Sequence, residues 1–166
     1  QFYEYVVKDL EGGDDLDVES REAAVRRLVK AVVSCDVFQD PPIQRGYEGP
    51  YDIVYTASCL EDCCQNVQQF EEAVARLTSL LYDGGRLVMN VSCGEEGTSS
   101  YYCLGDVKLP ELNITEDEAL SALHACGYHD KNITFIKQTP HCADIFPVDV
   151  APAVEEMMFI IAEKGM

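Results

Sequence analysis

Between residues 51 and 91 the sequence places a strand, a helix, a pair of glycines and a second strand in succession, and this segment constrains the fold most. Residues 51–56 and 86–91 are apolar with little alternation, as in strands buried on both faces. Residues 65–81 carry apolar side chains at helical spacing, and Gly84 and Gly85 can end that helix. The apolar positions are Val67, Phe70, Val74, Leu77 and Leu81. This order predicts a βαβ unit of a parallel sheet, and therefore an α/β fold.

Weaker patterns flank this unit. Thr115 and Glu118 have the spacing of a capping box and predict a helix that Gly127 ends. The glycines at 84–85 and Gly127 are expected to end helices. The sequence shows no internal repeat and no second domain. Further expected elements are a strand or short helix at 2–10, a helix from residue 18, strands at 29–37, 131–139 and 157–164, a flexible loop at 94–97 and an extended segment at 99–107.

Composition narrows the class of protein. The 166 residues include 47% apolar side chains, enough for one core, and carry a formal net charge of −18. That charge repels nucleic acid and anionic lipid, and no apolar run approaches the ~20 residues that span a membrane. The eight cysteines are unevenly spread, and no second Cys/His pair accompanies the cluster Cys59, Cys63 and Cys64. We therefore expect a cytoplasmic protein with reduced thiols and no metal site.

Two stretches resemble a known enzyme family. The strand Tyr-Asp-Ile-Val at 51–54, followed after a helix by Leu-Leu-Tyr-Asp-Gly-Gly-Arg-Leu-Val at 80–88, is similar to the fourth and fifth strands of class I methyltransferases, with Asp83 in place of the usual proline. The segment Ser-Ser-Tyr-Tyr-Cys-Leu-Gly-Asp-Val-Lys at 99–108 resembles the nicotinamide, phenylethanolamine and indolethylamine N-methyltransferases. Residues 35–37, 58–61 and 159–164 match the same group. The resemblance implies the C-terminal part of a Rossmann-like, mostly parallel sheet with flanking helices.

The resemblance also implies a cofactor, S-adenosylmethionine, and residues that contact it. Asp36 would accept a hydrogen bond from the adenine amino group, since a carboxylate is an acceptor only. Val37 would pack on the adenine ring. Thr56, Ala57 and Ser58 would lie at the carboxyl end of the first central strand, where open α/β sheets bind their ligands.

For the methyl acceptor, the resemblance implies a pocket lined by Ser99, Tyr102 and Asn90. An aromatic face suits a flat or cationic amine. Asn90 stands where the nicotinamide enzyme has an aspartate, so the lost charge argues against nicotinamide itself, and residues 91–98 form a longer loop than the family's. No catalytic side chain is expected, because positioning and desolvation supply most of the catalysis in transfer from an activated sulfonium.

The glycine-rich cofactor turn of these enzymes is missing: the chain has no G-x-G and no strand before residue 29 that could precede one. We therefore expect residues 1–166 to form a single partial methyltransferase domain with an uncovered sheet edge, through which chains could associate. The leading hypothesis is an N-methyltransferase for a small amine or N-heteroaromatic. The alternatives are a non-catalytic, truncated relative that binds a partner, and a methyltransferase with an oxygen or sulfur acceptor.

Overall fold

The computed structural model describes residues 17–94, 99–104, 106–138 and 156–165, in two compact units that divide after Ser34. The first unit contributes helix α2 (Val18–Leu28), as expected from residue 18 onward, and the Asp17 carboxylate caps it by accepting from the amides of Glu19 and Ser20. The strand expected at 29–37 is wrong: this β-rich run lacks a partner strand in the described chain and makes only an isolated bridge between Cys35 and Ile43. The element expected at 2–10 lies outside the described residues.

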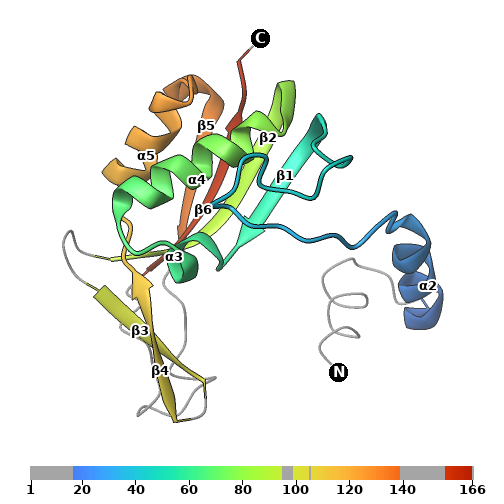
Figure 1. Cartoon of the computed structure of the whole chain (residues 1–166), viewed down its shortest axis with the longest axis horizontal. Coiled ribbons are helices and arrows are strands. Elements are labelled where there is room, and N and C mark those ends of the chain that lie inside the picture. The colour runs from blue at the N-terminus through green and yellow to red at the C-terminus, as the bar shows by residue number, and fades with distance from the viewer. Residues whose placement is uncertain (1–16, 95–98, 105, 139–155, 166) are drawn as a thin grey trace. The chain divides into compact units, whose positions relative to one another are not determined.

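The second unit is built on a four-stranded sheet (Figure 1). Its strands are β1 (Tyr51–Ala57), β2 (Leu81–Cys93), β5 (Ile133–Gln138) and β6 (Glu156–Glu163), in the order β1-β2-β6-β5. Strands β1 and β2 pair in parallel, which confirms the predicted βαβ unit. Strand β6 pairs antiparallel with both β2 and β5, so three strands run one way and β6 runs against them. The expected α/β fold, with most strands running in one direction, is therefore confirmed, and the sheet is mixed because β6 is inserted between β2 and β5.

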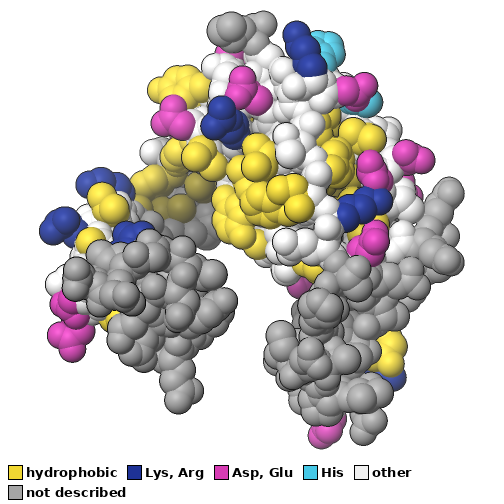
Figure 2. Space-filling model, turned by 180° about the vertical axis from the view of Figure 1, so that it is seen from behind, with side chains coloured by type: hydrophobic (Ala, Val, Ile, Leu, Met, Phe, Trp, Pro, Cys, Tyr) yellow, Lys and Arg dark blue, Asp and Glu magenta, His cyan; other side chains and the backbone are white. Residues whose placement is uncertain are grey.

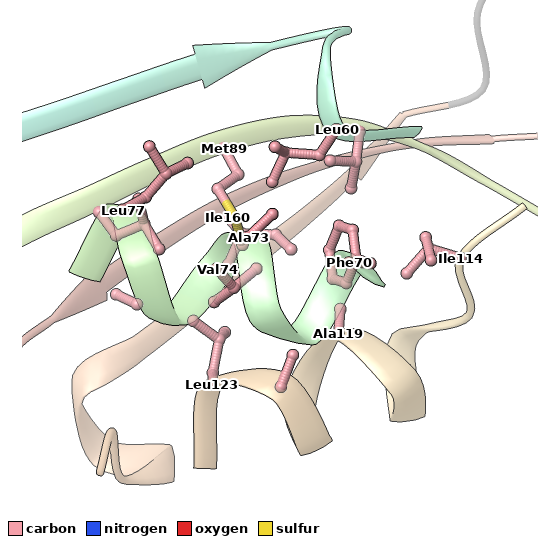
Figure 3. Close-up of a cluster of buried hydrophobic side chains, with 14 of the residues drawn as sticks. Leu60, Phe70, Ala73, Val74, Leu77, Met89, Ile114, Ala119, Leu123 and Ile160 are labelled. Carbon is pink, nitrogen blue, oxygen red and sulfur yellow. The ribbon is translucent and has the colours of Figure 1, made fainter. Parts of the chain in front are cut away.

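Helices cover one face of this sheet and form the core with it. They are α3 (Leu60–Cys63), α4 (Val67–Ser79) and α5 (Glu116–Ala125), followed by the short 3-10 turn η2 (Asp130–Asn132). Figure 3 shows Phe70, Val74 and Leu77 of α4 in this core with Met89 of β2 and Ile160 of β6. The helical spacing of α4 and the alternation of β2 therefore direct apolar side chains into one shared cluster.

The helix ends follow local chemistry. Asn66 caps α4 by accepting from the amide of Gln69, and Thr115 and Glu118 form the predicted capping box at α5. Gly127 has φ +86 directly after the α5 C-cap, where a left-handed residue ends a helix. The glycine pair at 84–85 differs from the prediction. Helix α4 already ends at Ser79, and the pair lies within β2 where its register with β1 is irregular.

The opposite face of the sheet is only partly covered by the described residues. Figure 2 views this face and shows hydrophobic side chains gathered on it. Ile53 and Tyr55 of β1 are 61% and 62% exposed, so the expectation of a strand buried on both faces is wrong for β1. The physical reason is that β1 has one neighbouring strand, β2, within the described residues. None of the helices that the structure describes is long and apolar enough to cross a bilayer.

A hairpin extends from the carboxyl end of β2. It consists of β3 (Ser99–Leu104) and β4 (Val107–Leu112), paired antiparallel. The extended segment expected at 99–107 is confirmed, whereas its return strand was not predicted. Cys93 bridges to Ile114 at the hairpin base, and Gly94 lies so close to Asn113 that an added Cβ would come within 2.6 Å of that side chain. The base of the hairpin is therefore packed tightly against the sheet. The loop expected at 94–97 falls almost wholly outside the described residues.

Candidate functional site

The residues predicted at the end of the first central strand meet β2 at one point. Thr56 pairs with Met89 and Ala57 with Asn90, and the Ser58 amide donates to the Asn90 carbonyl at 2.9 Å. Ser58 has φ +44, an uncommon conformation for a residue with a side chain, and it turns the chain out of the sheet. Such backbone outliers are concentrated at functional sites. Thr56, Ala57, Ser58 and Asn90 are therefore brought together at the carboxyl end of the parallel pair.

The loop that carries Asp36 and Val37 is held on two sides. Val37 is buried in the core, and its carbonyl accepts from the Arg76 guanidinium of α4 at 3.1 Å. The Asp36 amide donates to the Pro42 carbonyl at 2.7 Å, while its Oδ1 accepts from the Phe38 amide at 3.0 Å. The Asp36 carboxylate is exposed, and Oδ2 takes no partner among the described residues. The geometry leaves one carboxylate oxygen facing solvent, as an adenine amino group would require.

An electrostatic interaction between two cysteines relates this loop to the end of β1. Burial raises the pKa of the Cys35 thiol, and the charges of Cys59 and Asp36 raise it further. Asp36 follows Cys35 and Ser58 precedes Cys59, so this interaction joins the loop predicted to bind adenine with the segment that follows β1. Among the described side chains, the cysteines that form no disulfide are Cys35, Cys59, Cys63, Cys64, Cys93 and Cys126.

The predicted acceptor residues lie on two elements. Asn90 is half-buried on the sheet face opposite α4, in register with Phe159 of β6. Ser99 pairs with Leu112 and Tyr102 with Leu109 in the hairpin, but their side chains lie outside the described structure. The backbone therefore places Ser99 and Tyr102 on the hairpin that leaves the carboxyl end of β2, while their orientation stays a prediction.

Three residues that received no predicted role form the most buried polar cluster of this region. Glu61 of α3 has no exposed surface, and its Oε1 accepts from the Ser92 amide of β2 at 2.9 Å. The Ser92 hydroxyl donates to Oε1 of Glu111 on β4, which is 6% exposed. Burial, and then the charges of Asp62 and Glu111, raise the pKa of Glu61 to about 7. Ser92 thus joins two buried carboxyl groups, one from each side of the hairpin contact.

A signal for this cluster existed in the sequence. Alternation along β4 places Glu111 on the same face as Leu109 and Asn113. An acidic side chain therefore lies on the face of the hairpin that is buried. Glu61 belongs to the 58–61 segment that matched the family, next to the fully buried Leu60. The four-residue helix α3 is too short to give a helical period, which is why the burial of Glu61 could not be predicted.

Comparison with known proteins adds to this geometry. A sequence profile of the NNMT/PNMT/TEMT family matches residues 2–165. Nicotinamide N-methyltransferase of Homo sapiens is 34% identical over 122 residues, covering 74% of this chain and 44% of that protein. Phenylethanolamine N-methyltransferase of Homo sapiens is 31% identical over 117 residues, covering 69% of this chain and 40% of that protein.

Solved structures agree on the fold. A SAM-dependent methyltransferase from Methanosarcina mazei superposes with a TM-score of 0.52 at 11% identity, over 74% of this chain and 63% of that chain. At that identity the likeness concerns the fold alone. The chain spans about half the length of the curated relatives it matches.

Proposed function

The chain belongs to the NNMT/PNMT/TEMT family, and on that premise we propose that it supplies the adenine side and the acceptor side of an S-adenosylmethionine-dependent N-methyltransferase site. The observation that carries the proposal is the meeting of Thr56, Ala57 and Ser58 with Asn90 at the carboxyl end of β1 and β2. The charge interaction between Cys35 and Cys59 relates the neighbouring Asp36 loop to this end of the sheet. Ligands of open α/β sheets bind at this end of the strands. Free thiols also support the cytoplasm as the compartment.

Each residue has a task that its surroundings support. The free oxygen of Asp36 would accept the adenine amino group, and Val37 would pack on the adenine ring. The hydrogen bond from Arg76 to the Val37 carbonyl would hold the loop against the core. Thr56, Ala57 and Ser58 would form the floor beside the cofactor. When bound, S-adenosylmethionine supplies an activated methyl group, and the chain's own residues would orient the acceptor and exclude water from it.

The acceptor is proposed to be a small amine or N-heteroaromatic. Asn90 is uncharged and half-buried, so it can hydrogen-bond a polar substituent without demanding a positive charge. Tyr102 would add an aromatic face from the hairpin. The curated relatives are named for nicotinamide and phenylethanolamine, two nitrogen acceptors of different shape.

A partner-binding role is the second candidate, because one observation favours it. Strand β1 has a single described neighbour, and Ile53 and Tyr55 are exposed beside it. An uncovered strand and an apolar face are features of chain association. Titration of the chain with S-adenosylmethionine separates the two roles, since a protein that only binds partners would take up no cofactor.

We expect Asp36→Ala to weaken S-adenosylmethionine binding about tenfold or more, because a hydrogen bond to a charged acceptor contributes roughly 1.5–3 kcal/mol. Isothermal titration calorimetry on the whole chain measures the affinity. Asp52→Ala is the matched control, since Asp52 is an exposed aspartate near the opposite end of β1. Equal affinity of wild type and Asp36→Ala would remove Asp36 from the site, and absence of cofactor binding by the wild type would reject the proposal for this chain.

Methyl transfer to a panel of acceptors tests the reaction itself. With a labelled methyl group, we expect transfer to primary or secondary amines or to pyridines, and none to matched thiols and phenols. A preference for thiols or phenols would replace the N-methyltransferase by an oxygen- or sulfur-directed enzyme.

A further inference from the structure

Two buried carboxyl groups face each other where the hairpin packs against the sheet. Helix α3, which carries Glu61, packs against β4, which carries Glu111. Ser92 at the end of β2 lies between them: its amide donates to Glu61 and its hydroxyl to Glu111. The same hydroxyl lies 3.6 Å from the sulfur of Met157 on β6, so an apolar side chain closes the remaining side. Ser92 of the sheet therefore binds one acid of the hairpin and one acid of α3.

The second oxygen of Glu61 decides which charge state this arrangement accommodates. Oε2 is fully buried and has no hydrogen-bond partner within the described residues. No lysine, arginine or histidine of the described chain forms an ion pair with Glu61. An ionised carboxylate would leave a buried charge uncompensated, which is far less favourable than burying the neutral acid. The buried surroundings of Oε2 therefore favour a protonated carboxyl group.

The neighbouring ionisable groups add to this preference. The ionisable groups that interact electrostatically with Glu61 are Asp62 of α3, the Cys64 thiol directly after α3, and Glu111 of β4. Strands β2 and β6 contribute the uncharged Ser92 and Met157. Ionisation of Glu61 would thus place a second negative charge opposite Glu111, across the contact between α3 and β4.

We propose that Glu61, Ser92 and Glu111 form a proton-dependent latch that holds the β3–β4 hairpin against the sheet while Glu61 is neutral and loosens it when Glu61 ionises. In the closed hairpin Glu61 keeps its proton, whereas in an open hairpin water would solvate the carboxylate. The hairpin base stays anchored by the Cys93–Ile114 bridge and by the packing of Gly94 on Asn113. Loosening therefore separates β4 from α3 rather than unfolding the sheet.

The direction with pH follows from linkage. The pKa of Glu61 is about 7 with the hairpin closed, against 4.5 for a solvated glutamate. Opening becomes more favourable as pH rises between these two values and levels off above the higher one. The hairpin also carries Ser99 and Tyr102, so the latch would govern entry to the acceptor pocket. That last consequence rests on the proposed function, whereas the latch itself does not.

Hydrogen exchange measured by mass spectrometry tests the latch in the absence of cofactor and acceptor. A negative result would reject the latch without affecting the proposed function, which the cofactor titration tests separately. Protection factors, corrected for intrinsic exchange, are compared at pH 5.5 and 7.5 for β4 and α4. We expect β4 to be less protected than α4 at both values, because it opens locally. Between the two values, β4 should lose protection about tenfold or more. In Glu61→Gln this loss should shrink to less than about twofold.

Two further variants keep the outcome decisive. Glu111→Gln removes the facing charge and should give a smaller pH-dependent loss than wild type. Glu48→Gln, an exposed glutamate on the loop before β1, should behave as wild type. The latch is refuted if β4 exchanges locally with protection that is independent of pH, if β4 is as protected as α4, or if Glu61→Gln and Glu111→Gln keep the full wild-type loss.

Discussion

Replacing Phe70 by alanine is expected to lower the free energy of unfolding by about 3–5 kcal/mol, the range for deleting a buried aromatic ring. Phe70 has no exposed surface and belongs to the same buried cluster as Leu60, Ile114 and Ala119 (Figure 3). These neighbours come from α3, from the segment after β4 and from α5. One ring therefore supports three elements, and the cavity left behind cannot be closed by moving a single side chain.

Urea unfolding followed by circular dichroism measures this effect, since the chain has no tryptophan for intrinsic fluorescence. Gln68→Ala is the matched control on the same helix: Gln68 is exposed, and we expect a change within about 0.5 kcal/mol. Phe70 also packs beside Ile114 at the hairpin base, so Phe70→Ala should reduce hydrogen-exchange protection there as well. A loss below about 1 kcal/mol would mean that the core between α4 and α5 is looser than its burial indicates.

The central βαβ unit could be predicted because its information is local. The apolar spacing of α4, the capping box at Thr115 and the left-handed Gly127 each act within one turn of helix. Strand β6 was predicted as a strand, but its insertion between β2 and β5 was not. That placement depends on pairing between segments far apart in the chain, which no local pattern records.

The two wrong predictions, a strand at 29–37 and a fully buried β1, also concern contacts between segments far apart in the chain. Residues 29–34 have the composition of a strand but no partner within the described chain, and β propensity has little effect without a neighbour. Strand β1 has the sequence of a buried strand, yet Ile53 and Tyr55 are exposed because β2 is its single neighbouring strand within the described residues. The composition of a segment thus indicates whether it is suited to a buried strand, but not whether a neighbouring strand or helix is present to bury it.

For the candidate site, the resemblance predicted Asp36, Ser58 and Asn90, and the geometry brings Ser58 and Asn90 to one end of the sheet. The resemblance assigned no role to Glu61 or Glu111. Their importance comes from burial and from the shared contact with Ser92, both of which are properties of the packed chain.

Glu61 should also make the stability of the whole chain depend on pH. Its pKa is raised from 4.5 to about 7 in the folded chain, so between these values the folded state holds a proton that the unfolded state has lost. Stability must then fall as pH rises from about 4.5 to about 7, and level off above that. For this shift the total loss is about 3 kcal/mol. Water does not screen this group in the folded chain, because the side chain is 0% exposed.

Glu61→Gln isolates this contribution, since glutamine has the shape of the neutral acid and cannot ionise. We expect wild type and Glu61→Gln to differ little near pH 5, and the variant to be the more stable by about 2–3 kcal/mol at pH 8. Urea unfolding at half-unit pH intervals measures the difference, and Glu48→Gln should follow the wild-type curve because Glu48 is exposed. Parallel curves for wild type and Glu61→Gln across this range would show that Glu61 is ionised in the folded chain, and would remove the basis for a neutral carboxyl group between β2 and the hairpin.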